Sequence, residues 1–155
     1  CFFFGIKFDK NNDIKSRGLI GFAIPDLGII FRSRWKGTLY EIQYAALLSL
    51  LKFIDSNKKN LGLIQFEILS DSAVVVYQIA NKRSISDGLM PFYNTVISYK
   101  SRINYRVSWV PYHENIAIVS LPDTPPLEPD VNFNFGNGEM SKFKELGQGH
   151  IDLLS

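Results

Sequence analysis

The sequence predicts an α/β domain, in which helices pack on a mixed five-stranded sheet. Three short apolar segments fill the first third of the chain and are joined by short turns, which is typical of an antiparallel meander. A long amphipathic segment follows, and strand and helix patterns then alternate, which predicts crossover connections to parallel strands. The length of 155 residues suits one domain with one core.

The strands of the meander are predicted at residues 2–8, 18–24 and 29–35. The first of these is apolar and rich in Phe, which favours a strand. Residues 9–17 are polar, and residues 25–28 contain Pro and Gly, so both segments are predicted to be turns. Connections this short make the three strands antiparallel neighbours.

The strongest helix pattern begins at Thr38. Thr38 is a suitable N-cap, and Glu41 three residues later completes a capping-box pattern. The segment 56–62 is predicted to end the helix. Apolar residues recur between these limits at helical spacing, at Leu47, Leu50, Leu51 and Ile54.

Strand and helix patterns alternate after this helix. Residues 63–69 predict a strand and residues 71–80 a second helix, although residues 74–76 are valines, which favour strand. Residues 89–99 predict a third helix, and residues 105–110 predict the last strand. The resulting order is β-β-β-α-β-α-α-β.

The chain changes character after residue 121, which predicts a domain over residues 1–121 and a tail over residues 122–155. Four prolines between residues 122 and 129 exclude regular structure locally. Residues 132–138 are rich in Gly and Asn. A short helix near residues 140–146 is the regular element expected in this tail.

Composition and charge indicate a globular domain. Apolar residues make up 46% of the chain and charged residues 21%, which is too apolar for disorder. The net charge of +2, with a pI near 8.6, permits nucleic-acid binding without arguing for it. A single cysteine excludes an internal disulfide, no apolar run reaches the roughly 20 residues of a membrane span, and no signal-peptide pattern opens the chain. We therefore expect an intracellular protein that does not contact a membrane.

Four segments occur in an order that resembles the ribonuclease H family. Residues 8–21 place Asp9 ahead of a Gly-x-x-Gly strand, and residues 38–47 carry Thr, Tyr, Ala and Leu at matching positions. Residues 68–75 place Asp-Ser after a strand, and residues 107–115 end in His-Glu-Asn. Together the segments cover the predicted domain. The resemblance is to type 1 ribonucleases H, and within them to short bacterial, archaeal and retroelement members.

This resemblance implies the sheet order 3-2-1-4-5 and hydrolysis of the RNA strand of RNA–DNA hybrids. Such hydrolysis uses two Mg²⁺ or Mn²⁺ ions about 4 Å apart, of which one activates water and the other stabilises the leaving oxygen. These ions prefer oxygen ligands, so several carboxylates must converge on one spot. The family supplies them from the first strand, the first helix, the end of the fourth strand and the segment after the fifth.

Two positions of the implied site are acidic in this chain. Asp9 occupies the first position and Asp71 the third, and both are candidate catalytic residues and metal ligands. Each has a structural alternative. Asp9 can be an ordinary turn aspartate, and Asp71 can be a helix N-cap.

The second position is Gln43 when the helix segments are matched on Thr38 and Leu47. Gln43 also shares the apolar stripe of this helix, the face that should meet the sheet. Glu41 is the acidic alternative, but it lies on a less apolar stripe and is needed for the capping box. An amide oxygen can bind a cation but adds no charge.

The fourth position is Val119 when the segment is counted from Asn115. Asp123 is the acidic alternative if the loop is longer, although it precedes Thr-Pro-Pro and can be a turn residue. His113 is a candidate for product release or proton transfer, or else a surface residue. Two carboxylates are thus retained and two lost, so any Mg²⁺ or Mn²⁺ would bind weakly. Lys10, at a position where the family usually has Gly, would oppose cation binding further.

Three hypotheses follow. The first is a degenerate ribonuclease H-like module that acts as a scaffold, an interaction domain or a nucleic-acid-binding domain, without a cofactor. The second is an active endoribonuclease with Asp9, Glu41, Asp71 and Asp123 as its acids. The third is an unrelated α/β binding protein, which a different strand order would favour. Candidate partners are an RNA–DNA hybrid or another nucleic acid, another protein domain, or a second copy of the chain.

Nucleic-acid contacts are predicted around the same site and on basic residues. Alternation along the third strand also explains Arg32 and Arg34 as a solvated surface. No stacking platform of exposed aromatic residues is expected, so binding should be weak and sensitive to salt. The candidate nucleic-acid ligands are Lys10, Asn11, Arg17, Ser72 and Asn115.

Overall fold

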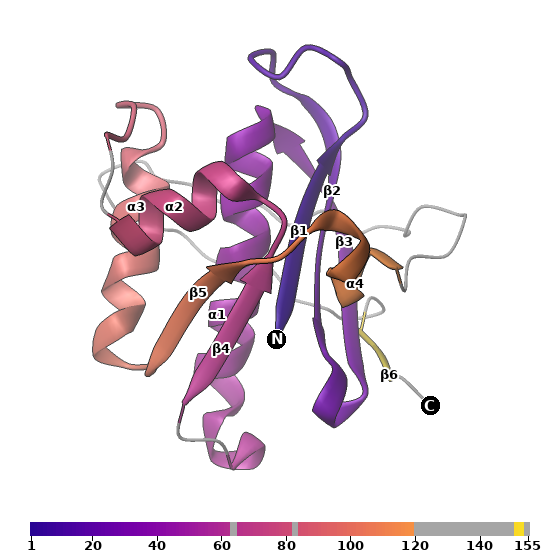
Figure 1. Cartoon of the computed structure of the whole chain (residues 1–155), viewed down its shortest axis with the longest axis vertical. Helices are drawn as coiled ribbons and strands as arrows, with labels where there is room; N and C mark the ends of the chain where they lie inside the picture. Colours follow the sequence, from indigo (N-terminus) through magenta and orange to yellow (C-terminus); the bar gives the residue numbers. More distant parts are fainter. Residues whose placement is uncertain (63–64, 82–83, 120–150, 154–155) are drawn as a thin grey trace.

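The first three strands form the predicted antiparallel meander. A computed structural model of the chain describes residues 1–62, 65–81, 84–119 and 151–153. A short 3-10 turn between the second and third strands ends at Gly28, whose φ of 64° is the left-handed conformation that glycine adopts without strain. The strands are β1 (Phe2–Lys7), β2 (Ser16–Ile24) and β3 (Ile29–Gly37) (Figure 1).

Helix α1 (Leu39–Leu61) confirms the predicted capping box. The Thr38 hydroxyl accepts the Glu41 backbone N–H at 3.4 Å, and the Glu41 carboxylate accepts the Thr38 backbone N–H at 3.0 Å. Gly62 ends the helix with a φ of 65°. The buried face of α1 packs against β1 and β2, because its apolar residues recur at helical spacing.

The rest of the sheet is built by parallel crossovers. β4 pairs parallel to β1, and β5 pairs parallel to β4, which gives the order β5-β4-β1-β2-β3-β6. The predicted order 3-2-1-4-5 and the predicted sequence of elements are therefore confirmed. The remaining elements are β4 (Phe66–Ser70), α2 (Ala73–Asn81), α3 (Met90–Ser98), β5 (Tyr105–Trp109), α4 (Ile116–Val119) and β6 (Ile151–Leu153).

Two elements add to the prediction. α4 is only four residues long and follows a 3-10 turn, Tyr112–Glu114. β6 comes from the segment expected to be a tail, and it pairs antiparallel with β3. The short helix predicted near residues 140–146, and most of that tail, lie outside the described residues.

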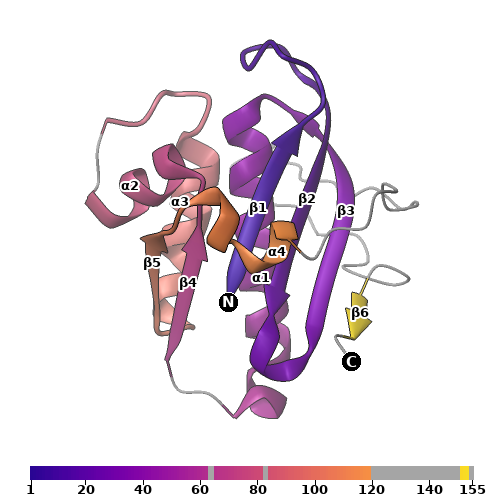
Figure 2. The same cartoon turned by 45° about the vertical axis from the view of Figure 1, so that its right-hand side comes forward.

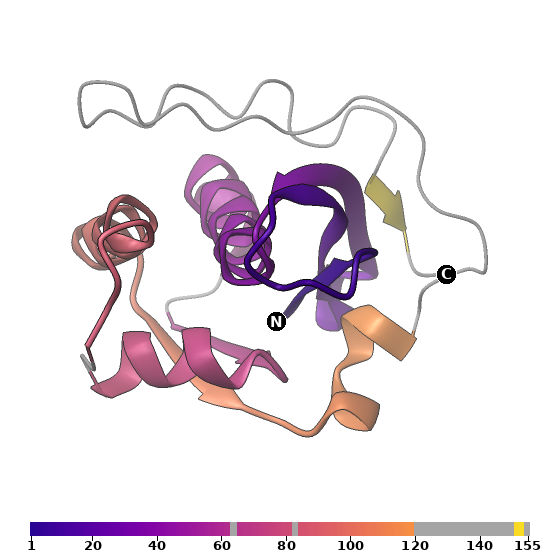
Figure 3. The same ribbon diagram turned by 90° about the horizontal axis from the view of Figure 1, so that it is seen from above.

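The helices cover opposite faces of the sheet. α1 and α3 lie on one face, whereas α4 crosses the other face over β1 and β2 (Figures 2 and 3). The main core lies under α1 and includes Val75 and Val76 of α2, so burial outweighs their strand preference. A smaller core lies under α4 and includes Phe4, Leu19, Ala23, Ile30, Ala117 and Ile118.

Gly5 sets how closely β1 approaches α1. A Cβ atom at Gly5 would lie 2.7 Å from Gln43 Cα and 2.8 Å from Gln43 N, which are backbone atoms that cannot move aside separately. Glycine in the middle of a strand often marks such an approach. The contact fixes Gln43 at the level of Gly5 on β1.

We expect Gly5→Ala to lower the free energy of unfolding by about 2 kcal/mol or more, because the added methyl group forces α1 away from the sheet. Urea denaturation measures the loss. Gly88→Ala is the matched control, since nothing lies within 4 Å of a Cβ there, and its effect should stay within about 0.5 kcal/mol. Equal effects of the two substitutions would contradict the close approach.

Candidate functional site

Asp71 directly follows β4, and a buried asparagine holds its carboxylate. Asn115 Nδ2 donates to Asp71 Oδ1 at 2.8 Å and to the Phe3 backbone carbonyl at 2.9 Å. Asn115 Oδ1 accepts the Ala117 backbone N–H at 3.1 Å, at the start of α4. Asn115 is fully buried, so this one amide joins β1, the end of β4 and α4.

The residue of β1 that lies beside Asp71 is Phe4. Phe2 pairs with Leu69 in the parallel β1–β4 ladder, so the register two residues later places Phe4 opposite Asp71. Phe4 is 1% exposed and belongs to the small core under α4. The first-strand position next to Asp71 is therefore apolar.

The structure does not bring Asp9 to Asp71. Asn115 joins Asp71 to the carbonyl of Phe3. From Phe3, β1 continues for four more residues, or about 13 Å at the usual rise per residue, and Asp9 lies beyond its end. Asp9 is exposed, and its Oδ1 accepts the Asn11 backbone N–H at 2.8 Å. This is the geometry of the turn aspartate that the sequence left as the alternative.

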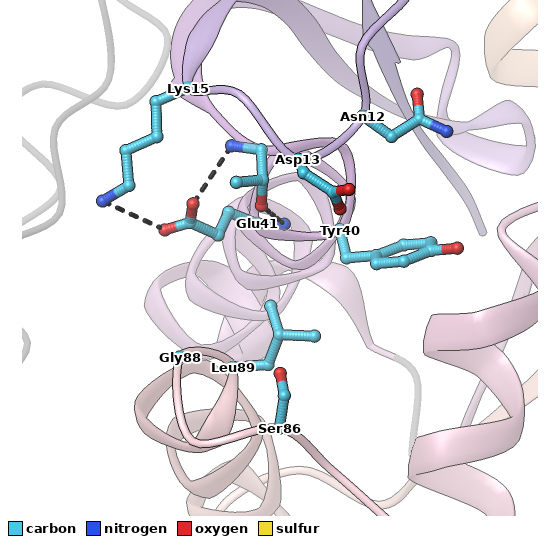
Figure 4. A pocket seen from close by; sticks show the side chains of 9 residues that line it. Asn12, Asp13, Lys15, Tyr40, Glu41, Ser86, Gly88 and Leu89 are labelled. Carbon is cyan, nitrogen blue, oxygen red and sulfur yellow. Dashed lines mark hydrogen bonds and ion pairs between the residues drawn. The ribbon is translucent and has the colours of Figure 1, made fainter.

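Both carboxylate oxygens of Glu41 are engaged at the start of α1. Oε1 accepts the Thr38 backbone N–H, and Oε2 lies 3.7 Å from Lys15 Nζ (Figure 4). Gln43, by contrast, lies at the level of Gly5, close to the level of Phe4 and Asp71. Its Oε1 is buried and has no hydrogen-bond partner within the described residues.

Val119 lies one helical turn after Asn115, since its backbone N–H donates to the Asn115 carbonyl at 3.1 Å. The side chain is apolar and 57% exposed. His113 is exposed in the 3-10 turn before α4. Asp123 lies outside the described residues. We refer to Phe4, Gln43, Asp71 and Val119 together as the Asp71 site.

The five predicted nucleic-acid ligands divide into two groups. Lys10, Asn11 and Arg17 are exposed, the first two in the β1–β2 turn and the third on β2. Ser72 and Asn115 are buried. Asn115 is occupied by the contacts described above, so it supports the fold and does not face a ligand.

A cavity of about 340 Å³ lies beside the first turn of α1 (Figure 4). Among the candidate catalytic and metal-binding residues that the structure describes, only Glu41 contributes to its wall. Asp71 is not part of it. The cavity is lined by Asn12, Asp13, Lys15, Thr38, Tyr40, Glu41, Ser86, Gly88 and Leu89.

The residues of the Asp71 site do not fit a pair of divalent cations. They provide one carboxylate and one amide oxygen, and the other two side chains are apolar. Within the described part of the chain, no group of three His, Cys, Asp or Glu side chains is placed to hold a metal ion. Two adjacent dications need several anionic oxygens to offset their charge.

The position of Phe4 was missed because the apolar strand at residues 2–8 offers no internal mark of its pairing register. Asp9 is the acidic residue nearest the end of the predicted strand, which is why the sequence favours it for the first position of the implied site. Gly5 was the available signal, because a lone glycine inside an apolar strand indicates a close backbone approach. That approach marks the part of β1 which faces Gln43.

Solved structures with the same fold are ribonuclease H domains. The RNase H1 of the halophilic archaeon Halobacterium salinarum is 18% identical, with a TM-score of 0.58 over 74% of this chain and 86% of that chain. The N-terminal RNase H domain of a Mycobacterium tuberculosis protein is 17% identical, with a TM-score of 0.58 over 74% and 84%. LC11-RNase H1, isolated from compost and solved in complex with an RNA/DNA hybrid, is 15% identical, with a TM-score of 0.59 over 74% and 88%.

These likenesses show that the fold is ribonuclease H-like. No protein-family model matches the sequence, and no curated protein matches it. Among the described residues, no helix is long and apolar enough to cross a membrane.

We expect Asn115→Ala to lower the free energy of unfolding by about 2–4 kcal/mol, because it leaves the Phe3 carbonyl, the Ala117 N–H and Asp71 without their shared partner. Thermal and urea denaturation measure the loss. The control is Asn94→Ala, at an exposed position of α3, where we expect less than about 0.5 kcal/mol. A loss below about 1 kcal/mol for Asn115→Ala would contradict the connecting role of this amide.

Proposed function

We propose that this ribonuclease H-like domain is a non-catalytic module that binds nucleic acid. The observation that carries the proposal is that Phe4, a buried aromatic residue, occupies the position of β1 that is level with Asp71 when the Phe2–Leu69 register is continued. A first-strand carboxylate of a two-metal site would be expected at this level of β1, and Gln43 and Val119 occupy two further positions at which the resemblance implies acidic residues.

The Asp71 site has too little negative charge to neutralise two divalent cations. A single carboxylate provides one negative charge against the four positive charges of two divalent cations. Repulsion between two such ions about 4 Å apart is large even at the effective dielectric constant of a protein surface. Asp71 also accepts a hydrogen bond from Asn115 on one of its oxygens.

The active alternative requires Asp9 and Glu41 to converge on Asp71. Asp9 lies beyond the end of β1 and accepts a hydrogen bond within its own turn. Glu41 caps α1 and contacts Lys15. Neither arrangement supports the active alternative.

The likeness to an RNase H1 solved in complex with an RNA/DNA hybrid supports nucleic acid as the partner. A module of this kind would retain the shape of the domain while lacking the chemistry of cleavage. Basic residues on β2 and β3, together with Lys10 and Asn11 in the β1–β2 turn, provide candidate phosphate contacts.

We expect the purified protein to leave a labelled RNA–DNA hybrid uncut in Mg²⁺ and in Mn²⁺, because the Asp71 site lacks the anionic ligands that hold both ions. Gel electrophoresis measures cleavage, with an active ribonuclease H in the same buffers as the positive control. The wild type should be no faster than its Asp71→Asn variant. Cleavage that disappears in Asp71→Asn would overturn the non-catalytic proposal.

Restoring acids should create a cation site. We expect the double variant Gln43→Glu, Val119→Asp to gain stability from Mn²⁺, since it has three carboxylates at the site, two new ones and that of Asp71. The gain should be about 1.4 kcal/mol at ten times the dissociation constant. Thermal denaturation with and without Mn²⁺ measures it. The wild type, and the double variant with Asp71→Asn added, should show no such gain; an equal gain in all three proteins would contradict the assignment.

A further inference from the structure

One face of the meander carries a concentration of cations. Ile30 of β3 packs in the small core under α4, so strand alternation places Arg32, Arg34 and Lys36 on that same face. Leu19 of β2 also belongs to this core, which places Arg17 on the face as well. Four positive side chains therefore share the α4 face of two neighbouring strands.

Strand register brings an exposed aromatic ring beside these cations. Phe8 donates its backbone N–H to the Arg17 carbonyl at 3.2 Å, and Arg17 pairs with Lys36 across the β2–β3 ladder. Phe4 points to the α4 face, so continued alternation places Phe8 there too. Phe8, Arg17 and Lys36 thus form one row across three chain segments, with neighbouring Cβ atoms about 5 Å apart.

The row is accessible. Phe8 is 57% exposed, and Arg17 and Lys36 are also exposed. α4 packs over the Phe4 level of β1 and β2, while the part of the meander nearest the β1–β2 turn carries no helix on this side in the described chain (Figure 2). We refer to Phe8, Arg17, Arg32, Arg34 and Lys36 as the basic sheet face.

Acidic groups are absent from this face of the three described strands β1, β2 and β3. Glu67 of β4 alternates onto the same side of the sheet as Phe4, but it forms an ion pair with Arg106 at 3.2 Å. Four basic residues and no acidic residue thus lie on this face of β1, β2 and β3, although the net charge of the whole chain is only +2.

We infer that the basic sheet face binds a single-stranded nucleic acid. The inference rests on the proposed function and names the surface that performs it. Arg17 and Lys36 contact phosphates, while Phe8 stacks on a base. A base must be unpaired to expose its ring face to Phe8, so the ligand is a single strand and not a duplex.

This surface is separate from the Asp71 site. Asp71 follows β4 and lies at the Phe4 level of β1, whereas the exposed row begins four residues further along the chain, at Phe8, and extends toward β3. Binding at the basic sheet face therefore requires no metal ion and none of the residues at the acidic positions.

Fluorescence anisotropy with labelled single-stranded RNA, single-stranded DNA and an RNA–DNA hybrid of one sequence tests the inference. We expect Phe8→Ala to weaken single-strand binding about tenfold, because base stacking is lost. Arg17→Gln with Lys36→Gln should weaken it further and reduce the slope of log affinity against log salt by about 1.4. Each variant lies at an exposed position, and circular dichroism confirms its folding.

Two controls match these variants. Tyr112→Ala removes an aromatic ring of similar exposure, 59%, from the turn before α4. Lys58→Gln with Lys59→Gln removes the same net charge from the last turn of α1. Both controls should bind single strands as the wild type does.

The outcomes separate the two proposals. Loss of binding in the variants but not in the controls supports the basic sheet face. Wild-type affinity in Phe8→Ala and in Arg17→Gln with Lys36→Gln, or binding of the hybrid but of neither single strand, overturns this surface and leaves nucleic-acid binding in place. If the wild type binds none of the three ligands at low salt, both this surface and the nucleic-acid part of the proposed function are wrong.

Discussion

The buried side chain of Asn115 connects three parts of the domain that lie far apart in the sequence. It ties the Phe3 carbonyl of β1 to the carboxylate of Asp71 after β4, and it accepts the N–H of Ala117 at the start of α4. A neutral amide makes this connection with hydrogen bonds alone, so it holds the three segments together without adding a charge beside Asp71.

Patterns of residues that are close together in the sequence predict most of the fold. The capping box at Thr38 and Glu41, the turns of the meander and the order of strands and helices follow from residues close together in the chain. The level of Phe4 beside Asp71 did not follow, because it depends on the register between β1 and β4, which are more than fifty residues apart in the sequence. α4 was missed because four residues are too few to show a helical period.

The candidate site was predicted unevenly for the same reason. The apolar stripe of α1 predicts that Gln43 faces the sheet, and the Gln43 backbone does lie against Gly5 of β1. The exposed row of Phe8, Arg17 and Lys36 was not anticipated, since each residue comes from a different segment and only the β1–β2–β3 register brings them together. The alternation of residues along β3 alone predicts a solvated surface. The strand register adds that an exposed aromatic ring lies beside basic residues on this surface.

The pairing of β6 with β3 covers part of the edge of the sheet, where another chain could otherwise add a strand. Ile29–Phe31 would otherwise present unpaired backbone donors and acceptors at the end of the sheet, which is a template for another chain. The short strand Ile151–Leu153 occupies those groups from within the same polypeptide. A chain shortened before residue 151 would leave that template open, and its solubility would then depend on the charges of β3 to repel a second sheet.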